Sequence, residues 1–309
     1  MRMTFLGANH DVTGSRTLLE VNGRYILIDD GMEQGENDFA SAPFPVAPGK
    51  IELVLLTHAH IDHTGMLPLL YKQGFRGAVY ATAETCSLCN IMLKDSAHIQ
   101  ESEAEYQTRK AMRAGKPAVE PLDALTDVEG LLPLFHPCRY GERFPITEGV
   151  DVRFTDIGHL LGSAAIELWL KEGGVERKIV FSGDVGNRNQ PIIKDPQAVD
   201  GADYLVIEST YGDRLHEQRS QANSVAFLAD VIQRTLDRGG NVVVPAFSVG
   251  RTQEMLYFIR EIKAQGMVHG HADFPVYVDS PLANEATSVF LQCQTDCLDE
   301  EARAVMAAG

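Results

Sequence analysis

The sequence predicts an α/β protein in two parts, a strand-rich part over residues 1–208 and an alternating part over residues 209–309. In the first part, short apolar and alternating segments are separated by glycines, a pattern typical of strands joined by tight turns. In the second part, helical and strand patterns alternate, which is typical of a parallel α/β unit. With 309 residues, 44% of them hydrophobic, the chain can bury a sizeable core.

Strand patterns dominate the first part, interrupted by two helical patterns. Apolar and alternating segments predict strands over residues 1–8, 15–21, 23–31, 51–57, 77–82, 149–159, 163–174, 177–186 and 202–210. The spacing over 63–74 predicts a short helix closed by Gly74. The highly charged segment 83–115 predicts a solvated helical excursion over the core.

The second part alternates between the two periodicities. Apolar residues at helical spacing predict helices over residues 223–236, 251–266 and 283–292. Between them, the segments 241–247 ("NVVVPAF") and 274–280 ("FPVYVDS") predict strands.

Composition narrows the cellular setting and the partners. No long apolar segment could serve as a signal peptide or a membrane span. Five cysteines, an odd number, argue against a disulfide framework and predict a cytoplasmic protein. The net charge of −16 counts against broad, nonspecific binding to nucleic acid. It does not exclude a nucleic-acid enzyme, because metal ions in a cleft can supply positive charge locally.

Four polar groups crowd into six residues at the end of a predicted buried strand. They are His58, His60, Asp62 and His63 in "LLTHAHIDHTG". A buried polar group without a partner costs about 1–3 kcal/mol, so such a cluster needs a common partner. A metal ion supplies one partner for all of them.

The spacing of these residues is compatible with two metal ions. His58 and His60 are two residues apart, so in an extended segment they project from the same face. Asp62 and His63 follow where the chain turns into a helix, and they can face a second point nearby. Imidazole and carboxylate groups suit zinc, with manganese or iron as substitutes. Two such points about 4 Å apart would form a two-metal hydrolytic site.

The pattern H-x-H-x-D-H is the signature of the metallo-β-lactamase superfamily, and further segments of the chain resemble that superfamily in order. "ILIDDG" resembles its first motif, with Asp29 as the matching acid and Asp30 as the alternative. "GHLLGSA" resembles the third motif and contains His159, and "FSGDVG" resembles the fourth and contains Asp184. The resemblance implies an αββα sandwich with two zinc ions, manganese being possible.

The resemblance also assigns roles within the site. It implies that one metal is held by His58, His60 and His159, the second by Asp62 and His63, and both by Asp184. It further implies that Asp29 accepts a hydrogen bond that orients a ligand histidine.

Segments after the fourth motif resemble the β-CASP family within this superfamily. They are "VIESTYGDRLH", "VVVPAFSVGRTQE" and "VYVDSPLA", and Glu208 matches the family's acidic motif A. The resemblance covers essentially the whole chain and points to bacterial and archaeal relatives of the messenger-RNA 3′-end cleavage nuclease. It implies part of a Rossmann-like β-CASP domain over residues 209–309, following the metallo-β-lactamase domain over residues 1–208.

The segment "PAFSVGRTQE" also predicts a place where the protein contacts substrate phosphates. A strand ends there, a turn follows, and a helix begins near Arg251. Because helix N-termini with small residues bind anions readily, Ser248 and Arg251 are candidates to approach substrate phosphates.

Two histidines that the family carries in its motifs B and C have no match here. Downstream of Glu208 the chain offers only His216, His269 and His271, in other contexts. We therefore expect a C-terminally incomplete protein. Glu208 would position the motif-B histidine in the complete enzyme.

The resulting functional expectation is metal-assisted hydrolysis of single-stranded RNA. We expect an endoribonuclease, with exonuclease action possible, in which Asp62 and Glu208 serve catalysis and a hydroxide activated by two metals attacks the phosphodiester. A homodimer is possible. Two alternatives stay open: another hydrolase of this fold, of the thioesterase or lactonase type, and a catalytically silent RNA-binding paralogue.

Overall fold

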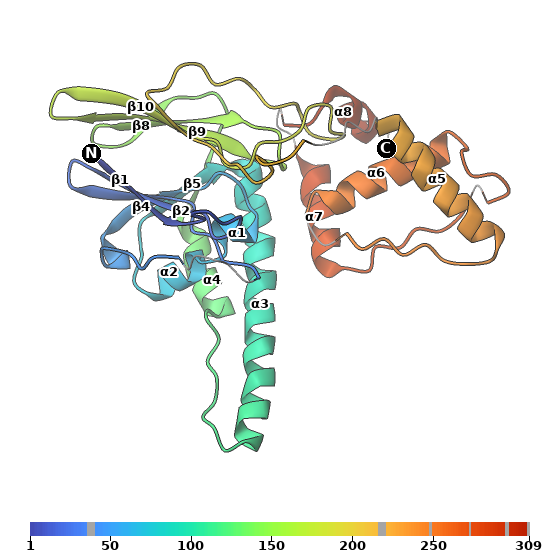
Figure 1. The fold of residues 1–309 in the computed structure, drawn as a ribbon, viewed down its shortest axis with the longest axis horizontal. Coiled ribbons are helices and arrows are strands. Elements are labelled where there is room, and N and C mark those ends of the chain that lie inside the picture. Colours follow the sequence, from blue (N-terminus) through green and yellow to red (C-terminus); the bar gives the residue numbers. More distant parts are fainter. Residues whose placement is uncertain (36–40, 216–220, 247–248, 272, 294–296, 308–309) are drawn as a thin grey trace.

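Two β-sheets stacked face to face form the body of the molecule in the computed structural model (Figure 1). The structure describes residues 1–35, 41–215, 221–246, 249–271, 273–293 and 297–307. The first sheet contains, in order, β1 (Arg2–Gly7), β2 (Arg16–Val21), β3 (Arg24–Ile28), β4 (Ile51–Leu55), β5 (Ala78–Thr82) and β6 (Phe135–Cys138). From β3 onward its neighbours are parallel.

The second sheet is mainly antiparallel and has the order β11-β10-β9-β8-β7. Its strands are β7 (Phe144–Thr147), β8 (Val150–Asp156), β9 (Ala164–Glu172), β10 (Val175–Phe181) and β11 (Tyr204–Val206). The last pair, β10 and β11, is parallel. A mixed α/β architecture with two sheets, as the sequence predicts, is therefore confirmed.

The first sheet is buried on both faces because its strands carry apolar residues in succession. Ile26 and Leu27 are adjacent in β3, so their side chains point to opposite faces. Ile26 packs in the core between the two sheets, with Phe154 and Ile166 of the second sheet. Leu27 packs in the other core, beneath the helices, together with Leu93.

Helices cover the outer face of the first sheet. The segments concerned are η1 (Pro48–Lys50), α1 (Ile61–Thr64), α2 (Leu67–Lys72), α3 (Ala83–Arg113), α4 (Leu125–Leu131) and η2 (Leu132–Leu134). Leu70 of α2 and Leu131 of α4 are fully buried in the core on this face. On the outer face of the second sheet, Val199 packs on Ala165 and Val180.

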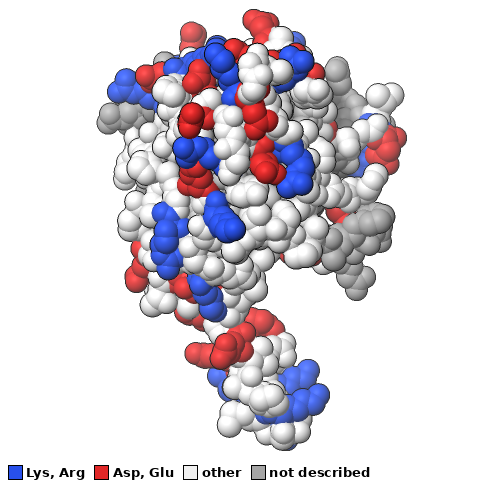
Figure 2. Space-filling view, turned by 90° about the vertical axis from the view of Figure 1, so that its left-hand side faces the viewer, with Lys and Arg blue, Asp and Glu red and all other residues white. Residues whose placement is uncertain are grey.

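Helix α3 continues beyond the body as an arm (Figure 1). Its 31 residues span about 46 Å at the rise of an α-helix. Thr82 caps its first turn by accepting a hydrogen bond from the amide of Thr85. Figure 2 shows Lys and Arg side chains gathered at the tip of the arm. Arg109, Lys110 and Arg113 lie there on an otherwise acidic chain.

The C-terminal part is helical in the described residues. It contains α5 (Gln221–Asp237), α6 (Arg251–Ala264), α7 (Pro281–Gln292) and α8 (Glu300–Ala307). A small separate core joins α5 to α6 through Val225, Ile232 and Ile262. Phe290 of α7 and Ala302 of α8 pack instead in the core that contains α3. Helices α7 and α8 thus pack at the base of the arm.

Two predicted strands of this part are wrong. Residues 241–246 and 274–280 form no strand and belong to no ladder in the part of the chain that the structure describes. Val243 and Tyr277 are each 85% exposed, although Val242 and Phe274 pack against the small core of α5 and α6. A β-branched sequence favours an extended backbone, but a strand also needs a neighbour to pair with.

The domain boundary after residue 208 stays a prediction. No helix among the described residues is long and apolar enough to cross a membrane.

Candidate metal centre

The ends of two neighbouring parallel strands bring the first polar groups of the site together. β3 ends at Ile28 and is followed by Asp29, whose amide donates to the carbonyl of Leu55 at the end of β4. Thr57 and His58 follow β4 after one intervening residue, Leu56, and His58 is completely buried. Because both strands end at the same edge of the sheet, these side chains meet there.

Main-chain contacts fix the turn that carries Asp62 and His63. The amide of Asp30 donates to the carbonyl of His63, and the amide of Ser15 donates to the carbonyl of Asp62. At Gly31 a side chain is impossible, because a Cβ atom would lie 1.6 Å from the Asp62 carbonyl oxygen. The loop after β3 therefore presses directly on the histidine turn.

The second sheet contributes His159 and Asp184 from two adjacent loops. His159 lies between β8 and β9, and Asp184 follows β10. Gly183 has φ +55°, and a Cβ atom there would lie 2.7 Å from Cβ of Thr57. Only glycine allows the Asp184 loop to approach the end of β4 this closely.

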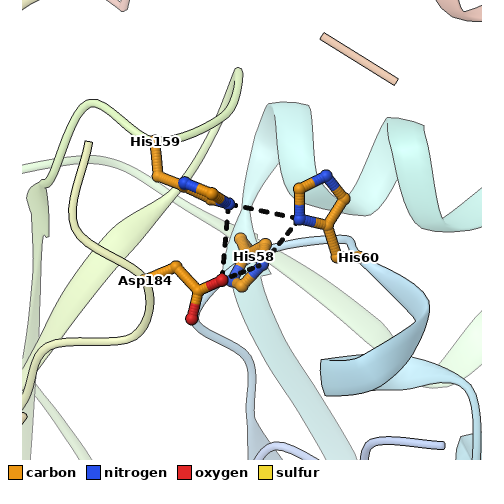
Figure 3. Close-up of side chains that lie close together, drawn as sticks. All are labelled: His58, His60, His159 and Asp184. Carbon is orange, nitrogen blue, oxygen red and sulfur yellow. Dashed lines mark hydrogen bonds and ion pairs between the residues drawn. The ribbon is translucent and has the colours of Figure 1, made fainter. Parts of the chain in front are cut away.

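Four donor atoms converge in what we define as the first cluster: His58, His60, His159 and Asp184 (Figure 3). Their ligand atoms all lie within 4.8 Å of one another. Nδ1 of His60 is 3.0 Å from Nε2 of His58 and 3.2 Å from Nε2 of His159. Oδ2 of Asp184 is 3.5 Å from Nε2 of His159 and 3.8 Å from Nε2 of His58.

The second cluster adjoins the first and contains Asp62, His63 and Asp184. Nε2 of His63 lies 3.2 Å from Oδ1 of Asp184 and 3.9 Å from Oδ2 of Asp62. Asp184 thus directs one carboxylate oxygen to each cluster. The six residues that the sequence singles out as metal ligands are all brought together.

Hydrogen bonds around Thr57 and Asp29 fix the tautomers of two histidines. Asp29 accepts from the amide and the hydroxyl of Thr57, at 2.8 and 2.9 Å. The Thr57 oxygen can then accept from Nδ1 of His58, 3.1 Å away. Nδ1 of His63 donates to Oδ2 of Asp29 at 2.8 Å. The Nε2 atoms of His58 and His63 are therefore both turned toward Asp184.

Lone pairs and carboxylates facing one another require a cation between them. Burial, followed by the neighbouring histidines, holds the pKa of His58 well below its usual value and lowers that of His60 to about 4. Burial also lowers the pKa of His159. These three rings are neutral and offer lone pairs, as metal ligands must. The donor set fits a divalent metal ion.

The pKa of His63 is shifted in the opposite direction from that of the other three histidines. Burial opposes its protonation, but Asp29 and Asp184 outweigh burial and raise the pKa of His63 well above its usual value. Its proton then lies between Nε2 and Asp184. A metal ion at the second cluster would take the place of that proton.

Asp30 lies apart from both clusters. Its carboxylate pairs with Nε of Arg16 at 2.5 Å. Burial raises its pKa to about 6, although Arg16 pulls it down. Of the two acids in "ILIDDG", Asp29 is the one whose carboxylate contacts a cluster histidine.

Glu208 acts on the main chain beside the clusters. One of its carboxylate oxygens accepts from the amide of Val185 at 2.5 Å, and the other accepts from the hydroxyl of Thr210. Because Val185 follows Asp184 directly, Glu208 anchors the loop that carries Asp184.

Of the two candidate phosphate contacts, Ser248 and Arg251, the structure describes only Arg251. Ser248 lies outside the described residues. Arg251 is exposed in the first turn of α6 and pairs with Glu254 at 2.6 Å. The preceding Gly250 lies against Leu160, the neighbour of His159, so α6 begins beside the first cluster.

Downstream histidines join neither cluster in the described part of the chain. His271 pairs with Asp237, and the amide of His269 bonds to Gln233. His216 lies outside the described residues. Sequence reasoning missed Thr57, whose hydroxyl organises Asp29 and His58; a threonine directly before the first histidine was the available signal.

An α/β sandwich with paired histidine–aspartate clusters at the strand ends defines a metal-binding protein of hydrolase architecture. The chain belongs to the metallo-β-lactamase superfamily, whose domain model matches residues 18–201. A Beta-Casp domain model matches residues 252–308 in addition. Membership implies divalent metal ions, and the two clusters fit them.

Curated relatives match nearly the whole chain. Ribonuclease TTHA0252 from Thermus thermophilus is 37% identical over 293 residues, which cover 94% of this chain and 61% of the relative. Transcription termination factor FttA from Pyrococcus abyssi is 29% identical over 301 residues, covering 94% of this chain and 43% of the relative. The chain therefore spans about half of the length of these relatives.

Among solved structures, the metallo-β-lactamase fold protein YhfI from Bacillus subtilis aligns with 60% of this chain and 63% of its own. The identity is 14% and the TM-score 0.35. So distant a likeness adds nothing to the assignment of the site.

Proposed function

We propose that the chain is the metal-binding part of a ribonuclease that hydrolyses phosphodiester bonds in single-stranded RNA. One observation carries the proposal: the two oxygens of Asp184 face two adjoining donor clusters. This is the arrangement needed to hold two metal ions side by side on one phosphate.

Zinc is the proposed metal at both positions. His58, His60 and His159 would hold one ion, Asp62 and His63 the other, and Asp184 both. Three imidazoles with a carboxylate match the ligands and the coordination number that zinc prefers. Manganese is the proposed substitute, because carboxylate-rich sites also suit it.

Metal ions bound there would lower the pKa of a coordinated water to about 7 and neutralise charge on the phosphoryl oxygens. The protein's own groups supply the orientation. Asp62, partly exposed beside His63, would accept a hydrogen bond from the attacking water. Asp29 holds the ring of His63 in place, and Glu208 holds the Asp184 loop.

Single-stranded RNA is the proposed substrate for two reasons. Of the relatives, one is named a ribonuclease and the other a transcription termination factor, and both kinds of protein work on transcripts. In addition, α6 begins beside the first cluster with Arg251 exposed in its first turn. A guanidinium at that place can meet a phosphate next to the one being cut.

The alternatives have less support. A thioesterase or lactonase has no need for the β-CASP domain matched at residues 252–308. A silent RNA-binding paralogue has no need to keep both donor clusters intact. We also propose a cytoplasmic location, supported by the odd number of cysteines, five, and a homodimer, which sedimentation velocity can test.

The deciding experiment combines metal analysis with RNA cleavage. End-labelled single-stranded RNA is incubated in zinc with the chain, with Asp184→Asn, and with the control Asp151→Asn, which removes a half-buried carboxylate that pairs with Arg143 and belongs to neither cluster. We expect two zinc ions at the clusters and cleavage in the chain and the control, and neither a full zinc complement nor cleavage in Asp184→Asn. Cleavage that survives Asp184→Asn would contradict the proposal.

A further inference from the structure

A third group of metal-type ligands lies outside the two clusters. Glu84, Cys293 and Cys297 each place one ligand atom within 4.8 Å of the others. Glu84 is the second residue of α3, Cys293 directly follows α7, and Cys297 precedes α8. The group therefore lies where the C-terminal helices meet the base of the arm.

The distances fit one tetrahedral ion. Sγ of Cys293 is 3.6 Å from Sγ of Cys297 and 3.8 Å from a carboxylate oxygen of Glu84. Zinc bonds of about 2.3 Å to sulfur and about 2.0–2.2 Å to oxygen put tetrahedral neighbours about 3.5–3.8 Å apart. Two of the three distances therefore match edges of such a tetrahedron, and the third, between Cys297 and Glu84, is at most 4.8 Å. A spacing of Cys-x3-Cys is also common in zinc sites.

Negative charge gathers around this group. Glu84 is buried, and no ion pair joins it to a Lys or Arg within the described ranges. Burial and the nearby charge of Glu84 contribute to a pKa of Asp156 raised to about 6, which Lys194 only partly offsets. Burial, then Asp156, Cys297 and Glu84, also raise the pKa of Tyr140 well above its usual value. A cation here would relieve this concentration of acidic groups.

The carboxylate of Glu84 lies in the first turn of α3, where the helix dipole favours negative charge. Cys293 is only partly buried, which leaves a side open for water as a fourth ligand. Cys297, by contrast, is enclosed in the core with Leu298 and Ala302.

We propose that Glu84, Cys293 and Cys297 bind a zinc ion that fixes the end of α7 to the beginning of α3. This ion is separate from the proposed catalytic pair, whose donors include no sulfur. Its role is structural: it joins a helix of residues 281–292 to one that begins at residue 83, and so holds the C-terminal helices beside the first cluster.

Cobalt tests this site selectively, because a thiolate–cobalt charge-transfer band in the near ultraviolet arises only from sulfur ligands. The reduced chain is titrated with Co²⁺, alongside Cys293→Ser, Glu84→Gln and the control Cys138→Ser. Cys138 is a partly buried thiol of β6 outside the group. We expect the band in the chain and the control, its loss in Cys293→Ser, and at least tenfold weaker cobalt binding in Glu84→Gln.

Zinc content supplies the second measurement, with folding checked by circular dichroism. We expect Cys293→Ser, in which the buried Cys297 is untouched, to contain one zinc ion fewer per chain than Cys138→Ser. The proposal is overturned if the reduced chain gives no band, if the band persists in Cys293→Ser, or if the zinc contents are equal. If the purified chain, before reduction, contains a Cys293–Cys297 disulfide in place of bound metal, the proposal is overturned as well.

Discussion

Oδ2 of Asp29 lies 2.8 Å from Nδ1 of His63, and this contact fixes which nitrogen of the ring faces Asp184. Replacing Asp29 by Asn removes the charge that holds the Nδ1 proton. We expect zinc affinity to fall about 10- to 100-fold, the usual cost of losing a carboxylate behind a ligand histidine. Competition with a chromophoric chelator measures this, with Asp151→Asn as the control. Unchanged affinity would show that Asp29 does not orient a ligand.

Gly183 allows the loop after β10 to approach Thr57 at the end of β4, and replacing it tests this contact. Gly183→Ala would combine a strained φ of +55° with a clash against Thr57, whereas Gly173→Ala has a similar φ of +58° in open space. We expect about 1–2 kcal/mol lower stability for Gly173→Ala, a larger loss for Gly183→Ala, and weaker zinc binding only in the latter. Urea unfolding and zinc titration compare the pair. Equal behaviour of the two variants would refute this role of Gly183.

Glu167 of β9 makes the free energy of unfolding depend on pH. It is fully buried and accepts from Arg153, Lys178 and Thr155 at 2.6–2.7 Å. Burial pushes its pKa up, but these partners outweigh burial and bring it down from 4.5 to about 2. Because the folded-state pKa is depressed, the stabilisation is complete above about pH 4.5 and is lost as the pH falls toward 2.

Glu167→Gln should therefore cost about 3 kcal/mol at pH 7, because it leaves the two basic groups without their counter-charge. The difference from the parent chain should shrink in urea unfolding below pH 4.5. Glu176→Gln, an exposed change on β10, should have little effect at either pH. A difference that stays constant down to pH 3 would mean that ionised Glu167 does not stabilise the fold.

Arg251 should contribute to RNA affinity without affecting metal binding. Arg251→Ala is compared with Arg260→Ala, an exposed arginine further along the same helix. We expect weaker RNA binding for Arg251→Ala alone, and a slope of log affinity against log salt reduced by about 0.7, corresponding to one phosphate contact on a single strand. Fluorescence anisotropy at several salt concentrations measures both. Identical slopes in the two variants would exclude the contact.

The metal centre was predictable from the sequence because its residues follow strands. His58 to His63 sit in one short turn, and His159 and Asp184 each end a readable strand pattern. The contacts of Thr57 with Asp29 and of Glu208 with Val185 were not predictable, because they depend on how close the loops approach. The contact of Glu84 with Cys293 was not predictable either, since these residues are 209 positions apart.

The fold was predictable to a similar degree. Periodicity identified the long helix and most strands of the two sheets, where each segment has a neighbour. It failed at residues 241–246 and 274–280, because propensity describes a backbone but not the partner that completes a ladder.

The arm formed by α3 can change in length without disturbing the two clusters. None of its residues after Ala104 is buried, and no ligand of either cluster lies on it. An insertion or deletion of about seven residues there, two helical turns, keeps the facing of the remaining side chains. The arm is therefore the place where the molecule can change length, or accept a fused domain, while the metal centre stays as it is.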